Sequence, residues 1–176
     1  MERHQKETFI GYEYRDVTVK KDYVSLYTDG YENFGWEIEG TESVIQPAGS
    51  VILKFKRDRK LRNKAELTRL QRQFDSLVEQ IIHLEKSKSV LALIVAIAIG
   101  ILGTAFIAGS VFAISYGNHI LLMIVLAIPG FVGWILPYFF YTRLVHQKTA
   151  EVNPVIEMKY DEIYEVTKRA NMLLEH

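Results

Sequence analysis

The feature that most constrains this chain is a segment without charge: residues 89–142 contain no Asp, Glu, Lys or Arg. The 21 basic and 21 acidic side chains all lie outside it. Within the segment, two apolar runs at residues 89–115 and 120–141 each exceed the roughly 20 residues that an α-helix needs to cross a bilayer core. The sequence therefore predicts a membrane protein with two transmembrane helices.

The connection between the two runs, residues 116–119, is short and polar, so we expect an antiparallel transmembrane helical hairpin at 89–142. Lys86 and Lys88 precede the first run and Arg143 follows the second, whereas the connection has neither Lys nor Arg. Because positive residues stay on the cytoplasmic side, this bias predicts that both termini are cytoplasmic. The first residues contain no apolar signal-peptide core, so the first membrane helix is expected to direct insertion.

Small residues recur at four-residue spacing in the first run, at Ala96, Gly100, Thr104 and Ala108. Such rows allow helix backbones to approach closely in lipid. Two interpretations stay open, because the row can pack against the second helix of the same chain or against another protomer.

Two helical segments flank the hairpin. Residues 59–88 predict a helical stalk with a heptad-like apolar seam; its members are Leu67, Leu70, Phe74, Leu77, Ile81 and Leu84. Residues 143–176 predict a C-terminal cytoplasmic helix antiparallel to the stalk. Asn153 and Pro154 are typical of a helix start, or mark a kink in one longer helix. The seams can pair within the chain or form an intermolecular coiled coil.

Residues 1–58 predict a small cytoplasmic α+β domain in the order β-α-β-β. Strands are expected at 9–20 and on both sides of a turn at 46–49, with a helix ending before Gly35, where a left-handed conformation is favoured. The expected domain core is Trp36, Ile38, Leu53 and Phe55. Glu39 is expected opposite Lys56, with the charged side chains on the outer face.

Glu37 and Glu39 are the residues most suggestive of acid–base catalysis, since two carboxylates on one strand face lie about 7 Å apart. Lysines opposite them instead favour ordinary surface ion pairs, so we expect no catalytic, cofactor-binding or metal-binding residues and no enzyme activity. The basic run at 54–64 could contact anionic lipid or nucleic acid; a solvated strand end and helix start is the simpler interpretation, so no nucleic-acid partner is expected. Cysteine is absent from the sequence.

Taken together, the stretches YEYRDVTVKKDYVSLYTDGYENFGWEIEG, LKFKRDRKLRNKAELTRLQRQFDSL, IGILGTAFIAGSVFAIS, LAIPGFVGWILPYFFY and EMKYDEIYEV are similar to an uncharacterised family of small bacterial two-helix membrane proteins with an N-terminal GWE-type domain of unknown function. The resemblance implies a bacterial inner (plasma) membrane setting and no particular activity.

The function expected from these features is that of a membrane-anchored, cytoplasm-facing adaptor or scaffold that binds a protein partner or self-associates. One alternative is a subunit of an oligomeric channel or transporter, with Gly130, Gly133 and Pro137 lining a path. The lack of charge within the membrane argues against ion selectivity. A second alternative is a small-ligand sensor or an enzyme domain that uses Glu37 or Glu39.

Overall fold

The computed structural model describes residues 11–117 and 119–175, and the chain divides into two compact units. The first, which we call the mixed unit, comprises Met1–Val78 and Tyr160–His176. The second, the helical unit, comprises Glu79–Lys159. Phe9 and Ile10, at the start of the first expected strand, and Asn118, in the expected turn, lie outside the described residues.

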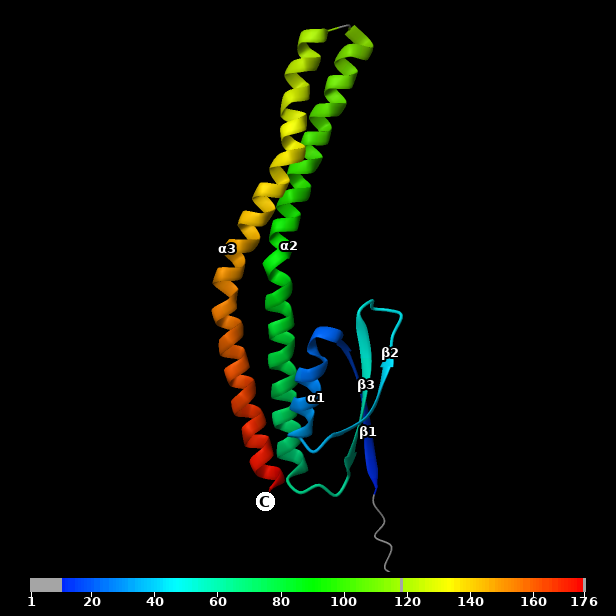
Figure 1. The fold of residues 1–176 in the computed structure, drawn as a ribbon, viewed down its shortest axis with the longest axis vertical. Helices are drawn as coiled ribbons and strands as arrows, with labels where there is room; N and C mark the ends of the chain where they lie inside the picture. Colours follow the sequence, from blue (N-terminus) through cyan, green and yellow to red (C-terminus); the bar gives the residue numbers. More distant parts are fainter. Residues whose placement is uncertain (1–10, 118, 176) are drawn as a thin grey trace, which may run out of the picture. The chain divides into compact units, whose positions relative to one another are not determined.

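The mixed unit has the predicted β-α-β-β order and the α+β class (Figure 1). Its elements are β1 (Tyr12–Lys20), a short 3₁₀ turn η1 (Lys21–Tyr23), α1 (Val24–Glu32), β2 (Glu37–Ser43) and β3 (Ser50–Asp58). The three strands form an antiparallel sheet in the order β1-β3-β2. The long strand β3 is therefore central, and the other two strands are edges.

The sheet has one covered face, because from Val51 onward β3 alternates between buried and half-exposed residues. Val51, Leu53 and Phe55 point to the covered face, where α1 and the first turns of α2 (Lys64–Gly117) pack. The ring of Tyr31 from α1 lies 4.6 Å from that of Phe55 and 6.1 Å from that of Phe74 on α2, measured between centroids. An aromatic cluster thus joins sheet and helices.

Gly35 ends the α1 segment as expected: its φ is 79°, in the left-handed region. Gly30 lies inside α1 despite its poor helix propensity, because the ring of Phe74 occupies the space where a Cβ would stand. Close packing against α2 therefore explains a glycine that the sequence alone marks as a weak point of the helix.

Two expectations for β2 are wrong. The pairing places Glu37, not Glu39, opposite Lys56, and a bulge between Ile38 and Gly40 shifts the register at Glu39. Ile38, expected in the core, is 45% exposed. It lies on an edge strand beside an open hollow shared with Thr28 and Trp36, so the helices do not cover it. Trp36, Leu53 and Phe55 are buried.

The two long helices are uninterrupted. The expected stalk begins at Lys64 and not at residue 59, and from there it and the first apolar run are one helix, α2. The second apolar run and the C-terminal segment are one helix, α3 (Ile120–Leu174), with Pro129, Pro137 and Pro154 inside it. Of the two interpretations of Asn153 and Pro154, the single longer helix is therefore observed. Both helices are long and apolar enough to span a membrane.

In the helical unit, α2 and α3 cross at glycines. A Cβ on Gly103 would lie 3.0 Å from the carbonyl oxygen of Gly130 and 3.1 Å from the Cα of Gly133. The backbones therefore approach so closely that no larger residue fits without moving a helix. Ser110 adds a hydrogen bond, donating from Oγ to the carbonyl oxygen of Met123 at 3.1 Å.

Candidate functional site

The covered face of the sheet also holds a cluster of charged residues. Arg57, at the end of β3, is almost fully buried, with 3% of its side chain exposed, and forms a 2.6 Å ion pair with Glu13 of β1. Its Nη1 donates to the carbonyl oxygen of Phe34 at 3.2 Å, and its guanidinium lies 4.3 Å from the Trp36 ring centroid. Lys64, the first residue of α2, binds the other oxygen of Glu13 at 2.6 Å.

The electrostatics of Glu13 reflect this double pairing. Burial acts to raise the pKa of the Glu13 carboxyl, but hydrogen bonds from Lys64 and Arg57 outweigh burial and hold the pKa below its ordinary value. Glu13 is therefore a carboxylate at neutral pH that links β1, β3 and α2.

A second group of polar side chains centres on Asp75 of α2. Its carboxylate accepts hydrogen bonds from Arg15 Nη2 and from the Tyr31 hydroxyl, both at 3.0 Å. Burial raises the pKa of Asp75 against the opposing effect of Arg15, and burial together with the Asp75 charge raises the pKa of Tyr31. Nearby, Trp36 Nε1 donates to Gln71 Oε1 at 2.9 Å.

These polar groups bind one another across β1, β3, α1 and α2, and their pairing fixes how the helices lie on the sheet. A pair of opposite charges satisfied internally costs less to bury than a lone charge, so such a cluster specifies a packing arrangement. The cluster therefore connects strands and helices of the mixed unit.

Beside the cluster, a groove of about 260 Å³ lies where α1, α2 and the end of α3 meet. Leu26, Phe74, Ile163 and Tyr164 give it an apolar floor and rim. Asp29 and Asn33 add polar groups on the α1 side. Tyr164 is 65% exposed there, so a large aromatic side chain is available for contact.

Glu37 and Glu39, considered above as a catalytic pair, are both exposed on β2. Glu37 borders the hollow of about 270 Å³ with Thr28, Glu32, Trp36 and Ile38. On β2, Glu42 forms the ion pair with a lysine: its carboxylate binds Lys54 Nζ at 2.5 Å. Glu37 and Glu39 lie on the edge strand β2, at and beside its bulge. The buried cluster of charged residues is on the covered face of the sheet.

The basic run at 54–64 is largely engaged within the mixed unit. Lys54 binds Glu42, Lys56 lies over the Tyr12 ring, and Arg57 and Lys64 share Glu13. Among the described residues, no group of three or more His, Asp or Glu is placed to hold a metal ion.

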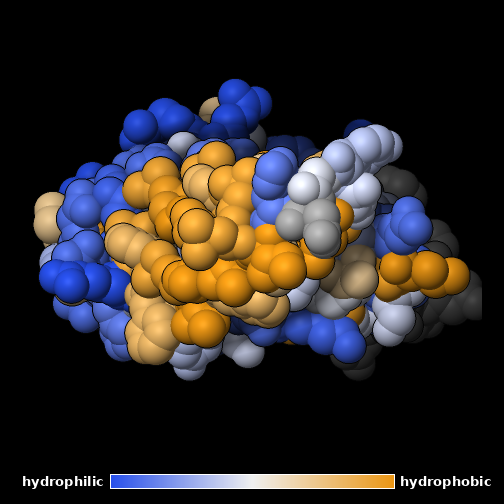
Figure 2. All heavy atoms as spheres, turned by 90° about the horizontal axis from the view of Figure 1, so that it is seen from above, coloured by the Kyte–Doolittle hydropathy of each residue, from blue (hydrophilic) through white to orange (hydrophobic). Residues whose placement is uncertain are grey.

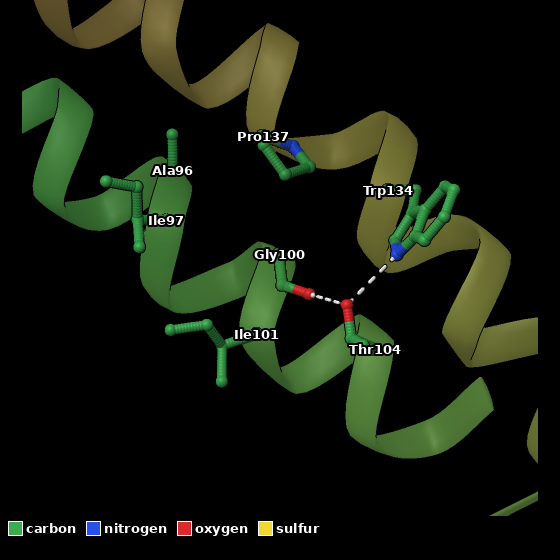
Figure 3. Close-up of a pocket in the computed structure, with 7 residues that line it drawn as sticks. All are labelled: Ala96, Ile97, Gly100, Ile101, Thr104, Trp134 and Pro137. Atoms are coloured by element: carbon green, nitrogen blue, oxygen red, sulfur yellow. Dashed lines mark hydrogen bonds between the residues drawn. The ribbon is translucent and has the colours of Figure 1, made fainter. Parts of the chain in front are cut away.

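The helical unit carries an open groove of about 500 Å³ (Figure 3). Trp134 and Pro137 of α3 face Gly100 and Thr104 of α2 across it, with Ile97 and Ile101 beside them. Thr104 Oγ1 donates to the Gly100 carbonyl oxygen at 2.9 Å and accepts a long hydrogen bond of 3.4 Å from Trp134 Nε1. The threonine hydroxyl is thus satisfied within an otherwise apolar surface.

The predicted packing residues fall into two groups. Leu67, Leu70, Phe74, Leu77 and Ile81 are buried in one chain and Leu84 is half-buried. In the small-residue row, Thr104 and Ala108 are exposed, and a Cβ on Gly100 would meet nothing within 4 Å. The close crossing uses Gly103 instead. Whether the row packs against another protomer stays a prediction.

Several important residues were missed from the sequence. Three of them are charged residues at inward-facing positions of strands: Glu13, Arg15 and Arg57. Aligning the strands in the sequence would show these charges at positions where the alternating pattern otherwise has apolar residues. Gly103, Gly130 and Gly133 were all visible as small residues, but only their juxtaposition identifies the crossing.

The chain matches no protein-family model, no curated protein and no solved structure. Its function is therefore inferred from the two units themselves.

Proposed function

We propose that the protein is a membrane-anchored adaptor: the uncharged parts of α2 and α3 cross a bilayer as a hairpin, and the mixed unit is presented on the cytoplasmic side to bind another protein. The observation that carries the anchor is the outward exposure of large apolar side chains along both helices, including Leu102, Phe131 and Phe139. Figure 2, a view onto the molecule from above, shows such side chains gathered on the surface. A surface of this kind suits lipid.

The orientation follows from the residues that border the uncharged segment. Lys86, Lys88 and Arg143 favour the cytoplasmic side for both chain ends, and the connection near Tyr116 and His119 would lie on the opposite side. We propose the bacterial inner membrane as the setting.

The absence of cysteine from the sequence makes this topology directly testable. Single cysteines at Tyr116, Ser43 and Asn171, all exposed positions, would be labelled with a membrane-impermeant maleimide in intact spheroplasts. We expect Tyr116→Cys to react before permeabilisation, and Ser43→Cys and Asn171→Cys to react only after it. Labelling of all three from outside, or of none in any membrane fraction, would contradict the proposed anchor.

The adaptor role rests on the groove at α1, α2 and α3, where the exposed Tyr164 offers an aromatic contact above an apolar floor. Interfaces are enriched in such side chains at their centres. The charged groups beside it are occupied in internal pairs, which favours a rigid binding module over an acid–base site.

A photoreactive benzoylphenylalanine at Tyr164 tests this role. The matched control is the same replacement at Tyr14, which is equally exposed, at 65%, on the open face of the sheet. We expect a discrete protein adduct from position 164 in native membranes and none from position 14. Equal adducts from both, or none from either, would count against a partner bound in the groove.

Self-association is a second candidate, favoured by one observation. Gly100, Thr104 and Ala108 form a row of small residues that is not used by the close helix crossing within the chain. A second copy could bring its own helix close to this row in the membrane.

A further inference from the structure

A small pocket in the helical unit differs from the grooves described above because two basic side chains line it together with apolar ones. It measures about 200 Å³ and lies between α2 and α3. Leu91, Ala92 and Leu144 form its apolar part, and Lys88 and Lys148 contribute one ammonium group from each helix. Gln147 and Glu151 complete the polar part.

The pocket lies at the border of the uncharged segment. Lys88 is the last charged residue before that segment, and Leu91 and Ala92 are already inside it. On α3, Leu144 follows the first charged residue after the segment, Arg143. If the segment spans a bilayer, its border falls at the level of the lipid headgroups.

The two lysines are held in matching ways. Lys88 Nζ binds Glu85 at 2.7 Å, and Lys148 Nζ binds Glu151 at 2.8 Å. Each glutamate lies three residues farther from the uncharged segment than its lysine, about 4.5 Å along a helix. Each glutamate therefore contacts its lysine on the side that faces away from the uncharged segment. An ammonium group has three N–H donors, so each lysine retains donors for another acceptor.

The charge balance at this border also favours an anion. The two lysines of the pocket are each paired with one glutamate, and Lys86 and Arg143 add two further positive charges at the same border. Lys88 lines the pocket, and its side chain is only 15% exposed. A basic pocket between membrane helices on the cytoplasmic side is suited to an anionic lipid headgroup.

We propose that this pocket binds the phosphate group of an anionic phospholipid, with Lys88 and Lys148 on the phosphate oxygens and the acyl chains beside Leu91 and Leu144. The inference rests on the proposed insertion of the hairpin into a membrane. A free phosphate ester shares the headgroup chemistry but would leave the apolar part of the pocket without a ligand, so the phospholipid is the better fit.

The test uses the full chain in nanodiscs of phosphatidylcholine containing a minor fraction of phosphatidylglycerol, followed by native mass spectrometry of the lipids that remain bound. We expect selective retention of phosphatidylglycerol by the unmodified protein. In the double variant Lys88→Gln, Lys148→Gln, retention should fall about tenfold, because both charge-assisted hydrogen bonds to the phosphate are lost.

The matched control is Lys86→Gln, Arg143→Gln, which removes two exposed charges from the same border without altering the pocket. This control should keep most of the selectivity. An equal loss in both double variants would show general electrostatic attraction and overturn the pocket. No selectivity in the unmodified protein would overturn it as well.

Two further arms separate the remaining outcomes. Glycerol 3-phosphate added in excess should not displace the lipid; full displacement would identify a soluble phosphate ester as the ligand and overturn the lipid assignment. Quenching of Trp134 fluorescence by brominated acyl chains in the same nanodiscs reports insertion, because Trp134 lies within the uncharged segment. A chain that inserts but shows no lipid selectivity refutes this site alone, whereas a chain that fails to insert refutes both the site and the proposed anchor.

Discussion

At the scale of single residues, the stability of the mixed unit depends on Arg57, because a guanidinium with 3% exposure has no access to bulk water. Replacing Glu13 with Gln leaves that charge without its carboxylate. We expect the free energy of unfolding to fall by about 2 kcal/mol, less than the roughly 3–5 kcal/mol for breaking a fully buried pair, because Glu13 is itself partly exposed. Urea unfolding of the full chain in detergent, followed by Trp36 fluorescence in a Trp134→Phe background, measures this.

The pH dependence of the same pair gives a second check. The pKa of Glu13 is lowered by folding, so its contribution is present above the unfolded value of 4.5 and is lost as pH falls through the folded pKa. The difference between the two proteins should therefore be largest near neutral pH and shrink below pH 4.5. Asp75 has a raised pKa and the opposite dependence, but it is common to both proteins and largely cancels in the difference. A constant difference across pH would contradict the assignment.

Gly35 supplies a second prediction at this scale. Gly35→Ala places a side chain at a φ of 79° and a Cβ 2.9 Å from Leu61 Cδ2. We expect a loss of about 1–2 kcal/mol in the free energy of unfolding. Gly40→Ala is the matched control, since a Cβ there meets nothing within 4 Å. Equal effects of the two substitutions in the same urea experiment would show that the left-handed conformation is unimportant.

Residue patterns predicted the buried positions of β3 well, because Leu53 and Phe55 alternate with lysines on a central strand. They failed for Ile38, whose burial depends on a bulge and on how far the helices extend over an edge strand. They also missed Arg57, since a charge in a basic run gives no local sign that Glu13, distant in sequence, will neutralise it.

At the scale of elements, the helix crossing makes opposite predictions for two glycines three residues apart. Gly103→Val should force α2 and α3 apart, because a Cβ already meets the backbone of Gly130 and Gly133. Gly100→Val has open space and should leave the packing intact. The thermal unfolding midpoint of the full chain in one detergent should fall for the first variant only. A larger fall for Gly100→Val would place the crossing elsewhere.

Self-association should show the reverse pattern. If a second copy packs on the row of Gly100, Thr104 and Ala108, Gly100→Val should reduce the dimer fraction in liposomes, counted by single-molecule photobleaching. An unchanged dimer fraction with Gly100→Val would show that this face of α2 is not the dimer interface. A wholly monomeric unmodified protein would do the same.

Helix type and the continuity of α2 were predictable, because neither the stalk nor the first apolar run contains a break before the polar connection. The continuity of α3 was not, since Asn153 and Pro154 also suit a helix start. Nor was the position of the close crossing, which lies at Gly103 and not along the row of Gly100, Thr104 and Ala108. Small residues identify candidate contact faces of a helix, and the small residues of the neighbouring helix decide which face is in contact.

At the scale of the whole molecule, the mixed unit is built from both ends of the chain. Ile163, Val166 and Ala170 of α3 are buried in it. Ala170→Asp should place a carboxylate in a fully enclosed position and unfold the unit, whereas Asn171→Asp adds the same charge at an exposed neighbour. Trypsin should then cut within residues 50–72 of the first variant far faster than in the second. Equal resistance would show that the end of α3 is dispensable.

This closure by the last residues also fixes an order of events during synthesis. Residues 160–174 leave the ribosome after the sheet and after both apolar segments, so the sheet emerges first but lacks one wall until this part of α3 follows. Under the proposed topology, that wall arrives on the correct side only after both apolar segments have been placed in the bilayer. If the second apolar segment failed to insert, the part of α3 that packs in the mixed unit could not reach the sheet. Completion of the mixed unit, and with it any partner binding, would thus be confined to correctly assembled chains.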